Sequence, residues 1–276
     1  AFYLIIGQRL ENSIRVIDDA FSAERVKLVE VSIKDLAANL GNKMLDWSAW
    51  DDTYEFVAKP NNDYIESNLQ SESIISLNIN LMLFVDQHNK IVYKKYINLS
   101  NGDEQDFSKE LLALVAPTSP LLKHADVRSH HEGMSFINGI NYVIASQPIV
   151  TSSKTGPIRG TLIWAYELND KILKNIMSKT TSQFTLSILD PKDNVLADKQ
   201  ETNALNQQED TYITHINVEE SVGTVLLPDI FGKDSFVIKV QLKRTVYAYG
   251  RSLITAIRNS LIGVTLLYTM VLFFFF

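Results

Sequence analysis

The sequence predicts an α+β fold with a long N-terminal helix, an antiparallel sheet with helices, a smaller mostly-β unit and a C-terminal membrane helix. Three observations support this prediction. Apolar residues recur at helical spacing near the start of the chain, strand-like runs separated by turn residues fill its middle, and an uncharged apolar run ends it. The predicted division of the chain is 1–7, 8–60, 61–180, 181–244 and 245–276.

The range 8–45 is predicted to be helical because it contains no proline and its apolar residues recur at intervals of three or four positions, or of seven, the sum of the two. The first apolar stripe comprises Leu10, Ile14, Ile17, Phe21, Leu28 and Val31, close to a heptad seam. Further along, the stripe moves to Ile33, Leu36, Leu40, Met44 and Trp47. Such a helix either meets a partner helix first, as from a second copy of the chain, and then its own domain, or lies along its own sheet throughout.

The range 61–180 has the element order of a PAS-like sheet with helices. Leu81–Asp86 and Ile91–Ile97 predict a hairpin across the turn QHNK, and Phe107–Val115 predicts a short helix. GMSFIN, NYVIASQPIV and GTLIWAYEL predict three more antiparallel strands, and Asn169 is available as the N-cap of a helix that ends at Met177.

The range 181–244 is predicted to be a small β subdomain. Its strand-like segments read QFTLSILD, VLAD, TYITHINV, VGTVLLPD and SFVIKVQLKR, with a polar, loop-like stretch QETNALNQQED among them.

Both ends of the chain are predicted to meet a membrane. Residues 261–276 carry no charge, and we expect residues 245–276 to be an exit helix and a truncated second transmembrane helix. Tyr247, Tyr249 and Arg258 fit an anchor at the membrane surface. The apolar start AFYLIIG, residues 1–7, is interpreted as the end of a first transmembrane helix, or else as a short apolar N-terminus.

Composition excludes several classes of function. The net charge of −6 argues against nucleic acid as a partner, because such binding needs clustered lysine and arginine. There is no cysteine, which excludes disulfides, thiolate nucleophiles and thiolate metal ligands. The sequence contains none of the motifs GxSxG, HExxH, GxxxxGK[ST] or GxGxxG, so no enzyme activity and no cofactor are predicted.

The segment LDWSAWDDTYEF, residues 45–56, raises the main question about a site. On one continuous helix, Asp51 would fall within the apolar face of Trp47 and Tyr54, with Trp50 at its edge, and would need a partner or a bound cation. Aromatic faces beside a carboxylate suit an ammonium group. Alternatively the helix breaks at Trp50 and restarts with Asp52 as an acidic N-cap, so that the acids satisfy backbone donors and bind nothing.

The histidine-rich loop KHADVRSHHEG contains weak candidates for metal ligands. Its histidines are His124, His130 and His131, and Glu132 follows directly. Adjacent histidines on a loop match no standard zinc spacing, so no metal is predicted, and a solvated loop is the simpler interpretation.

The segments DWSAWDDTYEFV and ASQPIVTSSKTGPIRGTLI together resemble the fourth type of CHASE domain. The segment LPDIFGKDSFVIKVQLKRTVYAYG before the apolar tail also resembles the stretch that commonly follows in such receptors. The resemblance covers most of the chain and implies an extracytoplasmic sensing domain of a bacterial or archaeal transmembrane receptor. Its implied outputs are cyclic-di-GMP enzymes or histidine kinases. Many relatives carry an arginine after the GTLI strand, where this chain has Trp164-Ala165-Tyr166.

The leading hypothesis is therefore a periplasmic or extracellular sensor domain, itself non-enzymatic, of a two-span receptor that forms a homodimer. Its partner would be a small molecule or a periplasmic binding protein. The predicted ligand pocket is walled by the sheet and by residues 45–56, which we call the Trp-Asp segment. It has six candidate residues: Trp47, Trp50, Asp51, Tyr54, Tyr142 and Tyr166. The alternatives are a membrane-anchored interaction module without a small-molecule pocket and, third, a metal-dependent hydrolase that uses the loop 124–132.

Overall fold

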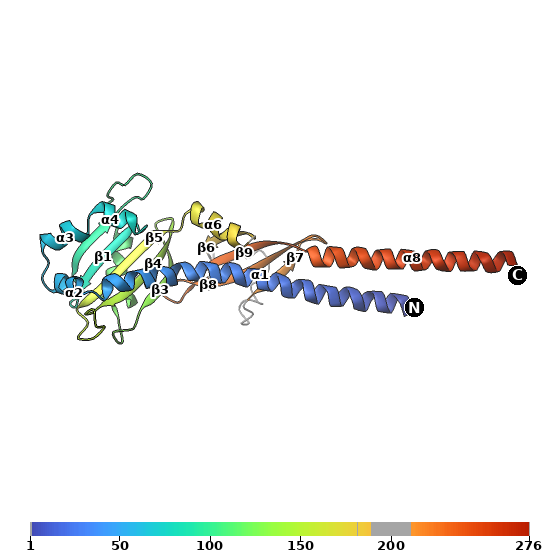
Figure 1. Ribbon diagram of the computed structural model, residues 1–276, viewed down its shortest axis with the longest axis horizontal. Coiled ribbons are helices and arrows are strands. Elements are labelled where there is room, and N and C mark those ends of the chain that lie inside the picture. The colour runs from blue at the N-terminus through green and yellow to red at the C-terminus, as the bar shows by residue number, and fades with distance from the viewer. Residues whose placement is uncertain (1, 181, 189–210, 276) are drawn as a thin grey trace.

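A single long helix organises the molecule. The computed structural model describes residues 2–180, 182–188 and 211–275. Helix α1 (Phe2–Ser48) runs alongside both β-sheets of the molecule (Figure 1). One face of α1 is buried against them, from Val26 and Val29 through Ile33 to Leu40 and Met44. The second apolar stripe predicted from the sequence therefore packs on the chain's own domain.

The first sheet has five antiparallel strands in the order β2-β1-β5-β4-β3. Its strands are β1 (Leu81–Asp86), β2 (Ile91–Tyr96), β3 (His131–Ile137), β4 (Ile140–Ile149) and β5 (Gly160–Glu167). The central strand β5 places Trp164 opposite Met82 on one side and Ala145 on the other. These are the strands that the sequence predicts, and they form the predicted PAS-like α+β arrangement.

Both faces of this sheet are covered. Helix α1 packs on one face together with α2 (Asp51–Ala58), α3 (Asn62–Asn68) and α4 (Ser71–Ser76). The opposite face is covered by α5 (Lys109–Leu112) and two 3₁₀ turns, Ala113–Val115 and Pro120–Leu122. Alternate residues of each strand point to opposite faces, so the sheet has two separate apolar cores.

Local signals explain where several of these short elements begin. Asn61 and Ser108 cap α3 and α5 by accepting hydrogen bonds from the backbone of Tyr64 and Leu111. The predicted helix Phe107–Val115 is shorter than expected, because only four residues are α-helical before a 3₁₀ turn continues to Val115. Helices α3 and α4 were not predicted.

The second sheet has four antiparallel strands in the order β6-β9-β8-β7. Helix α6 (Asp170–Thr180) leads to β6 (Gln183–Ile188), followed by β7 (Tyr212–His215), β8 (Glu220–Pro228) and β9 (Asp234–Lys243). As predicted, Asn169 caps α6, accepting a hydrogen bond from the Ile172 backbone N–H at 3.1 Å. The segment VLAD, predicted as a strand, lies outside the described residues.

Helix α1 approaches the second sheet at a glycine. A Cβ atom on Gly223 of β8 would overlap the side chain of Val26, so the two backbones come together only because this residue has no side chain. The sheets are also tied directly, since Ile230, just after β8, donates its backbone N–H to the Met134 carbonyl of β3 at 2.7 Å.

Helix α8 (Thr245–Phe275) leaves the second sheet and runs beside the N-terminal part of α1 (Figure 1). It is the one helix in the described residues that is long and apolar enough to cross a membrane, and the apolar stretch of it is wholly exposed. Near its start, Gly250 lies against Ile14 of α1. Both chain ends therefore point the same way.

A buried ion pair joins the start of α8 to α1. Arg244 donates from Nε to Oδ2 of Asp18 at 2.8 Å, and both side chains are about 95% buried. The other oxygen of Asp18 accepts the backbone N–H of Tyr247 at 3.2 Å, so an aspartate of one helix caps the N-terminus of the other. The Tyr247 hydroxyl donates to Glu11 of α1 at 2.8 Å. We call these four residues the α1–α8 junction.

The first predicted stripe of α1 is not used inside the chain. Leu10, Ile17, Phe21, Leu28 and Val31 are each between 41% and 55% exposed. Only Ile14, which lies against α8, is partly covered. The helix thus presents one apolar face to its own domain and a second to the outside.

We expect Asp18→Asn to lower the free energy of unfolding by about 3–5 kcal/mol, because it leaves the Arg244 guanidinium buried without a counter-charge. The double variant Asp18→Leu with Arg244→Met removes both charges and is expected to cost less. Denaturant unfolding in detergent micelles measures both. Asp35→Asn, exposed on the same helix, is the control, and a double variant less stable than the single one would contradict this account.

Candidate functional site

The two tryptophans of the predicted site are part of the core between α1 and the first sheet. The Trp47 ring meets Trp164 of β5 edge-on, with ring centroids 5.7 Å apart, and meets Trp50 at 6.3 Å. Trp50 in turn lies 5.9 Å from Tyr64 of α3. Both rings are partly exposed, and their packing joins three helices to the sheet.

The helix breaks at Trp50, as one of the two interpretations of the sequence predicts. Trp50 itself is the N-cap of α2, without a side-chain capping bond, and Asp51 and Asp52 occupy the first turn. Asp52 is therefore not the cap. Carboxylates in the first turn are favoured by the helix dipole, which accounts for two adjacent acids here.

Asp51 lies outside the apolar face and is exposed, because the break removes the continuous helix that would have buried it. Its Oδ1 accepts the backbone N–H of Ser152 at 2.9 Å, and its own N–H donates to Ser152 Oγ at 3.1 Å. The internal partner of Asp51 is thus the loop between β4 and β5.

The aromatic face of Tyr54 is covered by a cation of the chain itself. The Arg159 guanidinium lies 3.9 Å from the centre of the Tyr54 ring, and Arg159 also pairs with Glu55 at 2.7 Å. The Tyr54 hydroxyl donates to the Pro157 carbonyl at 3.1 Å. Arg159 occupies the position at which an external ammonium group would stack.

The two tyrosines of the sheet lie on opposite faces of it. Tyr166 packs on the α1 side, and its hydroxyl is 3.5 Å from the Leu36 carbonyl, to which it donates. Tyr142 is buried in the other core, with its hydroxyl 3.0 Å from that of Tyr96. Burial and the hydrogen bond that Tyr96 donates to Glu167 raise the pKa of Tyr96. The six predicted residues therefore do not line one common pocket, and their part in ligand binding stays a prediction.

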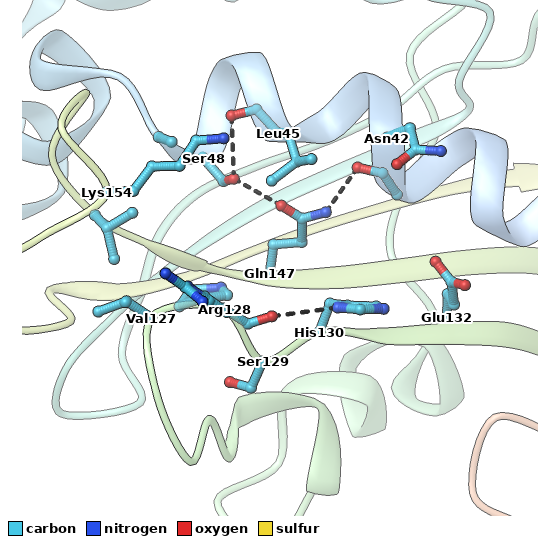
Figure 2. A pocket seen from close by; sticks show the side chains of 14 residues that line it. Asn42, Leu45, Ser48, Val127, Arg128, Ser129, His130, Glu132, Gln147 and Lys154 are labelled. Carbon is cyan, nitrogen blue, oxygen red and sulfur yellow. Dashed lines mark hydrogen bonds between the residues drawn. The ribbon is translucent and has the colours of Figure 1, made fainter.

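A pocket of about 260 Å³ lies between the last turns of α1, the edge of β3 and β4, and the loop that precedes β3 (Figure 2). Its polar lining includes Ser48, Arg128, His130, Glu132, Gln147 and Lys154. None of the six predicted residues lines it, although Leu45, Ser48 and Ala49 lie within the Trp-Asp segment.

Gln147 forms the fixed floor of this pocket. It is 5% exposed, its Nε2 donates to the Gly41 carbonyl of α1 at 2.6 Å, and its Oε1 accepts from Ser48 Oγ at 2.9 Å (Figure 2). The sequence did carry a signal for it: Gln147 is an amide in the mostly apolar run VIASQPIV, residues 143–150, and a buried amide needs partners.

The charges of the pocket are separated along its length. Arg128 and Lys154 lie at one end, Glu132 lies at the other, and His130 and Gln147 stand between them (Figure 2). Within the described part of the chain, neither Arg128 nor Lys154 forms a salt bridge. Lys154, with a φ of +56°, belongs to the same loop as Ser152, which is hydrogen bonded to Asp51. Asp51 is therefore connected to the pocket only through this loop.

Two of the three histidines of the loop 124–132, His124 and His131, make contacts within the fold. The rings of His124 and His131 are 5.6 Å apart, with His124 Nε2 3.2 Å from the Thr161 hydroxyl and His131 Nε2 2.9 Å from the Lys123 carbonyl. His130 is exposed. Among the described residues no group of three histidine or carboxylate side chains is placed to hold a metal ion.

Comparison with solved structures identifies the class of fold. The extracellular domain of a protein described as a histidine kinase, vpHK1S-Z8, matches 87% of this chain and 98% of its own length with a TM-score of 0.53 at 8% identity. A domain of a sensory box/GGDEF family protein of Vibrio parahaemolyticus matches 87% of this chain and 99% of its own, with a TM-score of 0.45 at 8% identity. The chain thus shares its fold with the extracellular domain of vpHK1S-Z8.

The family follows from the sequence comparison. Residues 32–187, more than half of the chain, match the CHASE4 domain, and the chain belongs to this family of sensor domains. It is 24% identical over 254 residues to the methanogenesis regulatory histidine kinase FilI of Methanothrix harundinacea (strain 6Ac). That alignment covers 91% of this chain and 27% of FilI, so the chain spans about a quarter of the length of this relative.

We predict that acid weakens the fold through His124. Burial, with the nearby His131, lowers the pKa of the His124 imidazole to about 4 from the 6.5 of a free histidine. Between these two values the unfolded chain binds the proton and the folded chain does not, so stability falls as the pH drops from about 6.5 to about 4.

Thermal unfolding of the wild type and of His124→Gln across this pH range tests the prediction. The variant is expected to lose part of the pH dependence. His88→Gln, which changes an exposed histidine in the β1–β2 turn, is expected to keep all of it, and an unchanged slope for His124→Gln would contradict the assignment.

Proposed function

We propose that this chain is the extracytoplasmic ligand-sensing part of a two-span transmembrane receptor. The observation that supports it most is that the N-terminal end of α1 and the C-terminal end of α8 lie side by side and extend from the same end of the molecule (Figure 1). If α8 crosses the membrane and residues 1–7 end a first span, both sheets stand on one side of the bilayer, with the five-stranded sheet farther from it. Family membership supports the sensing role.

The α1–α8 junction is the proposed path of the signal. The last turns of α1 border the pocket, its middle packs on both sheets, and its N-terminal half is joined to α8 through Asp18 and Arg244. A ligand that binds one position of α1 more tightly than another would shift the population of the two positions. Because the junction is buried and hydrogen bonded, displacement of α1 would act on the start of α8.

The proposed partner is a second copy of this chain in the same membrane. The exposed stripe of Leu10, Ile17, Phe21, Leu28 and Val31 follows heptad spacing, and Ile14 of the same series already packs on α8. Two copies that pair along this stripe would bury it as a coiled-coil seam. Such pairing would place two junctions and two α8 helices side by side.

The cytoplasmic output that we propose is a histidine kinase or a cyclic-di-GMP enzyme, with the kinase favoured because the relative FilI is a histidine kinase. The chain described here would itself be non-catalytic. Identity of 24% over a quarter of that relative supports the receptor class and leaves the ligand open.

A second candidate is a membrane-anchored module that binds a protein, such as a periplasmic binding protein. One observation favours it: Tyr54 and Asp51 are already satisfied by Arg159 and Ser152 within the chain. The polar pocket beside Gln147 is the feature that favours a small ligand instead.

The proposed topology is testable with single cysteines because residues 1–276 contain none of their own. We expect a membrane-impermeant maleimide to label Asn101→Cys, in an exposed loop of the first sheet, in intact cells. Ser146→Cys is buried in the same sheet and is expected to react only after denaturation. Labelling of Asn101→Cys that required cell lysis would place the domain in the cytoplasm and exclude the proposal.

The proposed dimer is tested with adjacent single cysteines. Ile17 lies on the exposed stripe, whereas its neighbour Val16 is equally apolar and 67% exposed but faces about 100° away around the helix. Oxidation in membranes is expected to convert most of the Ile17→Cys chain to a disulfide-linked dimer and little of the Val16→Cys chain. Equal cross-linking of both variants would indicate random collision instead of pairing along this stripe.

A further inference from the structure

We propose that the pocket beside Gln147 binds a small zwitterion, with its carboxylate at Arg128 and Lys154 and its ammonium group at Glu132. This deepens the proposed function and rests on it, since it names the class of ligand that the sensor would detect. It concerns none of the six residues that the sequence predicts for ligand binding.

The floor of the pocket is built on packed secondary structure. This floor is the buried amide of Gln147, held by one hydrogen bond to α1 and another to Ser48. A site on packed secondary structure is more precisely held than one on loops alone. Only one of the two Gln147 Nε2 protons is used by the Gly41 carbonyl, which leaves a second donor.

The cationic end calls for an anionic group. Arg128 and Lys154 come from different loops, and no salt bridge neutralises either of them within the described residues. Two unneutralised cations on one end of a hollow attract a carboxylate, and an arginine can hold it through two parallel hydrogen bonds.

The opposite end calls for a donor. Glu132 lies against α1 at Gly41, where a Cβ atom would come 2.7 Å from its Oε2, so a glycine makes room for the carboxylate. No salt bridge of Glu132 exists within the described residues, and an ionised carboxylate only accepts hydrogen bonds. A dicarboxylate would be repelled here, whereas an ammonium group would be attracted.

The size of the pocket limits the ligand. Its volume of about 260 Å³ is below the roughly 300–1,000 Å³ of sites for drug-sized molecules. A compound with a few carbon atoms between or beside its two charged groups fits this volume. Such a ligand would touch Asn42, Leu45 and Ser48 of α1, the helix that leads to the α1–α8 junction.

The test uses the chain of residues 1–276 in lipid nanodiscs and isothermal titration with four probes. L-alanine and β-alanine carry both charges, propionate carries the carboxylate alone, and n-propylamine carries the amine alone. We expect at least one of the two zwitterions to bind about tenfold or more tightly than propionate, and n-propylamine not to bind. Propionate or n-propylamine that bound as tightly as the better zwitterion would overturn the proposal.

Two charge variants separate this site from general surface electrostatics. Arg128→Gln is expected to weaken both zwitterion and propionate about tenfold. Glu132→Gln is expected to weaken the zwitterion but to leave propionate equal or tighter, because it removes a partner of the ammonium and a repulsion of the carboxylate. Lys109→Gln, which removes an exposed charge in α5, is the control and is expected to change neither zwitterion binding nor propionate binding.

Absence of binding by either zwitterion up to about 10 mM, or a zwitterion affinity that Glu132→Gln does not reduce, would overturn the proposed ligand class. Neither result would affect the proposed membrane topology or dimer, because those are read from cysteine labelling and cross-linking. Conversely, a domain labelled only after lysis would exclude the receptor role even if a zwitterion bound the pocket.

Discussion

The structure depends on one continuous buried face of helix α1. Val26, Val29, Ile33, Leu40 and Met44 pack on two different sheets, so a single rigid rod sets the position of both. A helix of 47 residues is about 70 Å long. Because it is one helix, rotation about its axis would change its packing on both sheets together. Gly223 shows how close this packing is, because a Cβ atom at this position of β8 would overlap the side chain of Val26.

The same helix has a different kind of contact at each level. At the two sheets it is held mainly by apolar packing, which permits small shear movements, and near its C-terminal end also by hydrogen bonds between Gln147 and Gly41 and Ser48. At the α1–α8 junction it is held by a buried charge pair, whose hydrogen bonds require defined positions of Asp18 and Arg244. A movement of α1 is therefore expected to pass the sheets with small adjustments and to be transmitted at the junction.

The Trp-Asp segment and the pocket meet at the break between α1 and α2. The segment contains the break between α1 and α2, its tryptophans fill the core beneath that break, and Asp51 holds the loop that carries Lys154. The segment thus lines one side of the pocket with Leu45, Ser48 and Ala49, while Gln147, Arg128 and Glu132 supply polar groups from other elements. A motif that is diagnostic of a family need not supply the ligand contacts, because a required turn geometry constrains residues just as strongly.

The sequence by itself determined the α+β class, the strands of the first sheet, the long helix and its two apolar stripes, and the break at Trp50 as one of two alternatives. These depend on local periodicity and turn chemistry, which neighbouring residues decide among themselves. Only the tertiary structure decided which face of the sheet Tyr142 and Tyr166 occupy, that Arg159 covers Tyr54, and that Asp18 meets Arg244. Those contacts join residues about 100 or more positions apart, or depend on how strands pair, and their energies arise only when packing excludes water from both partners.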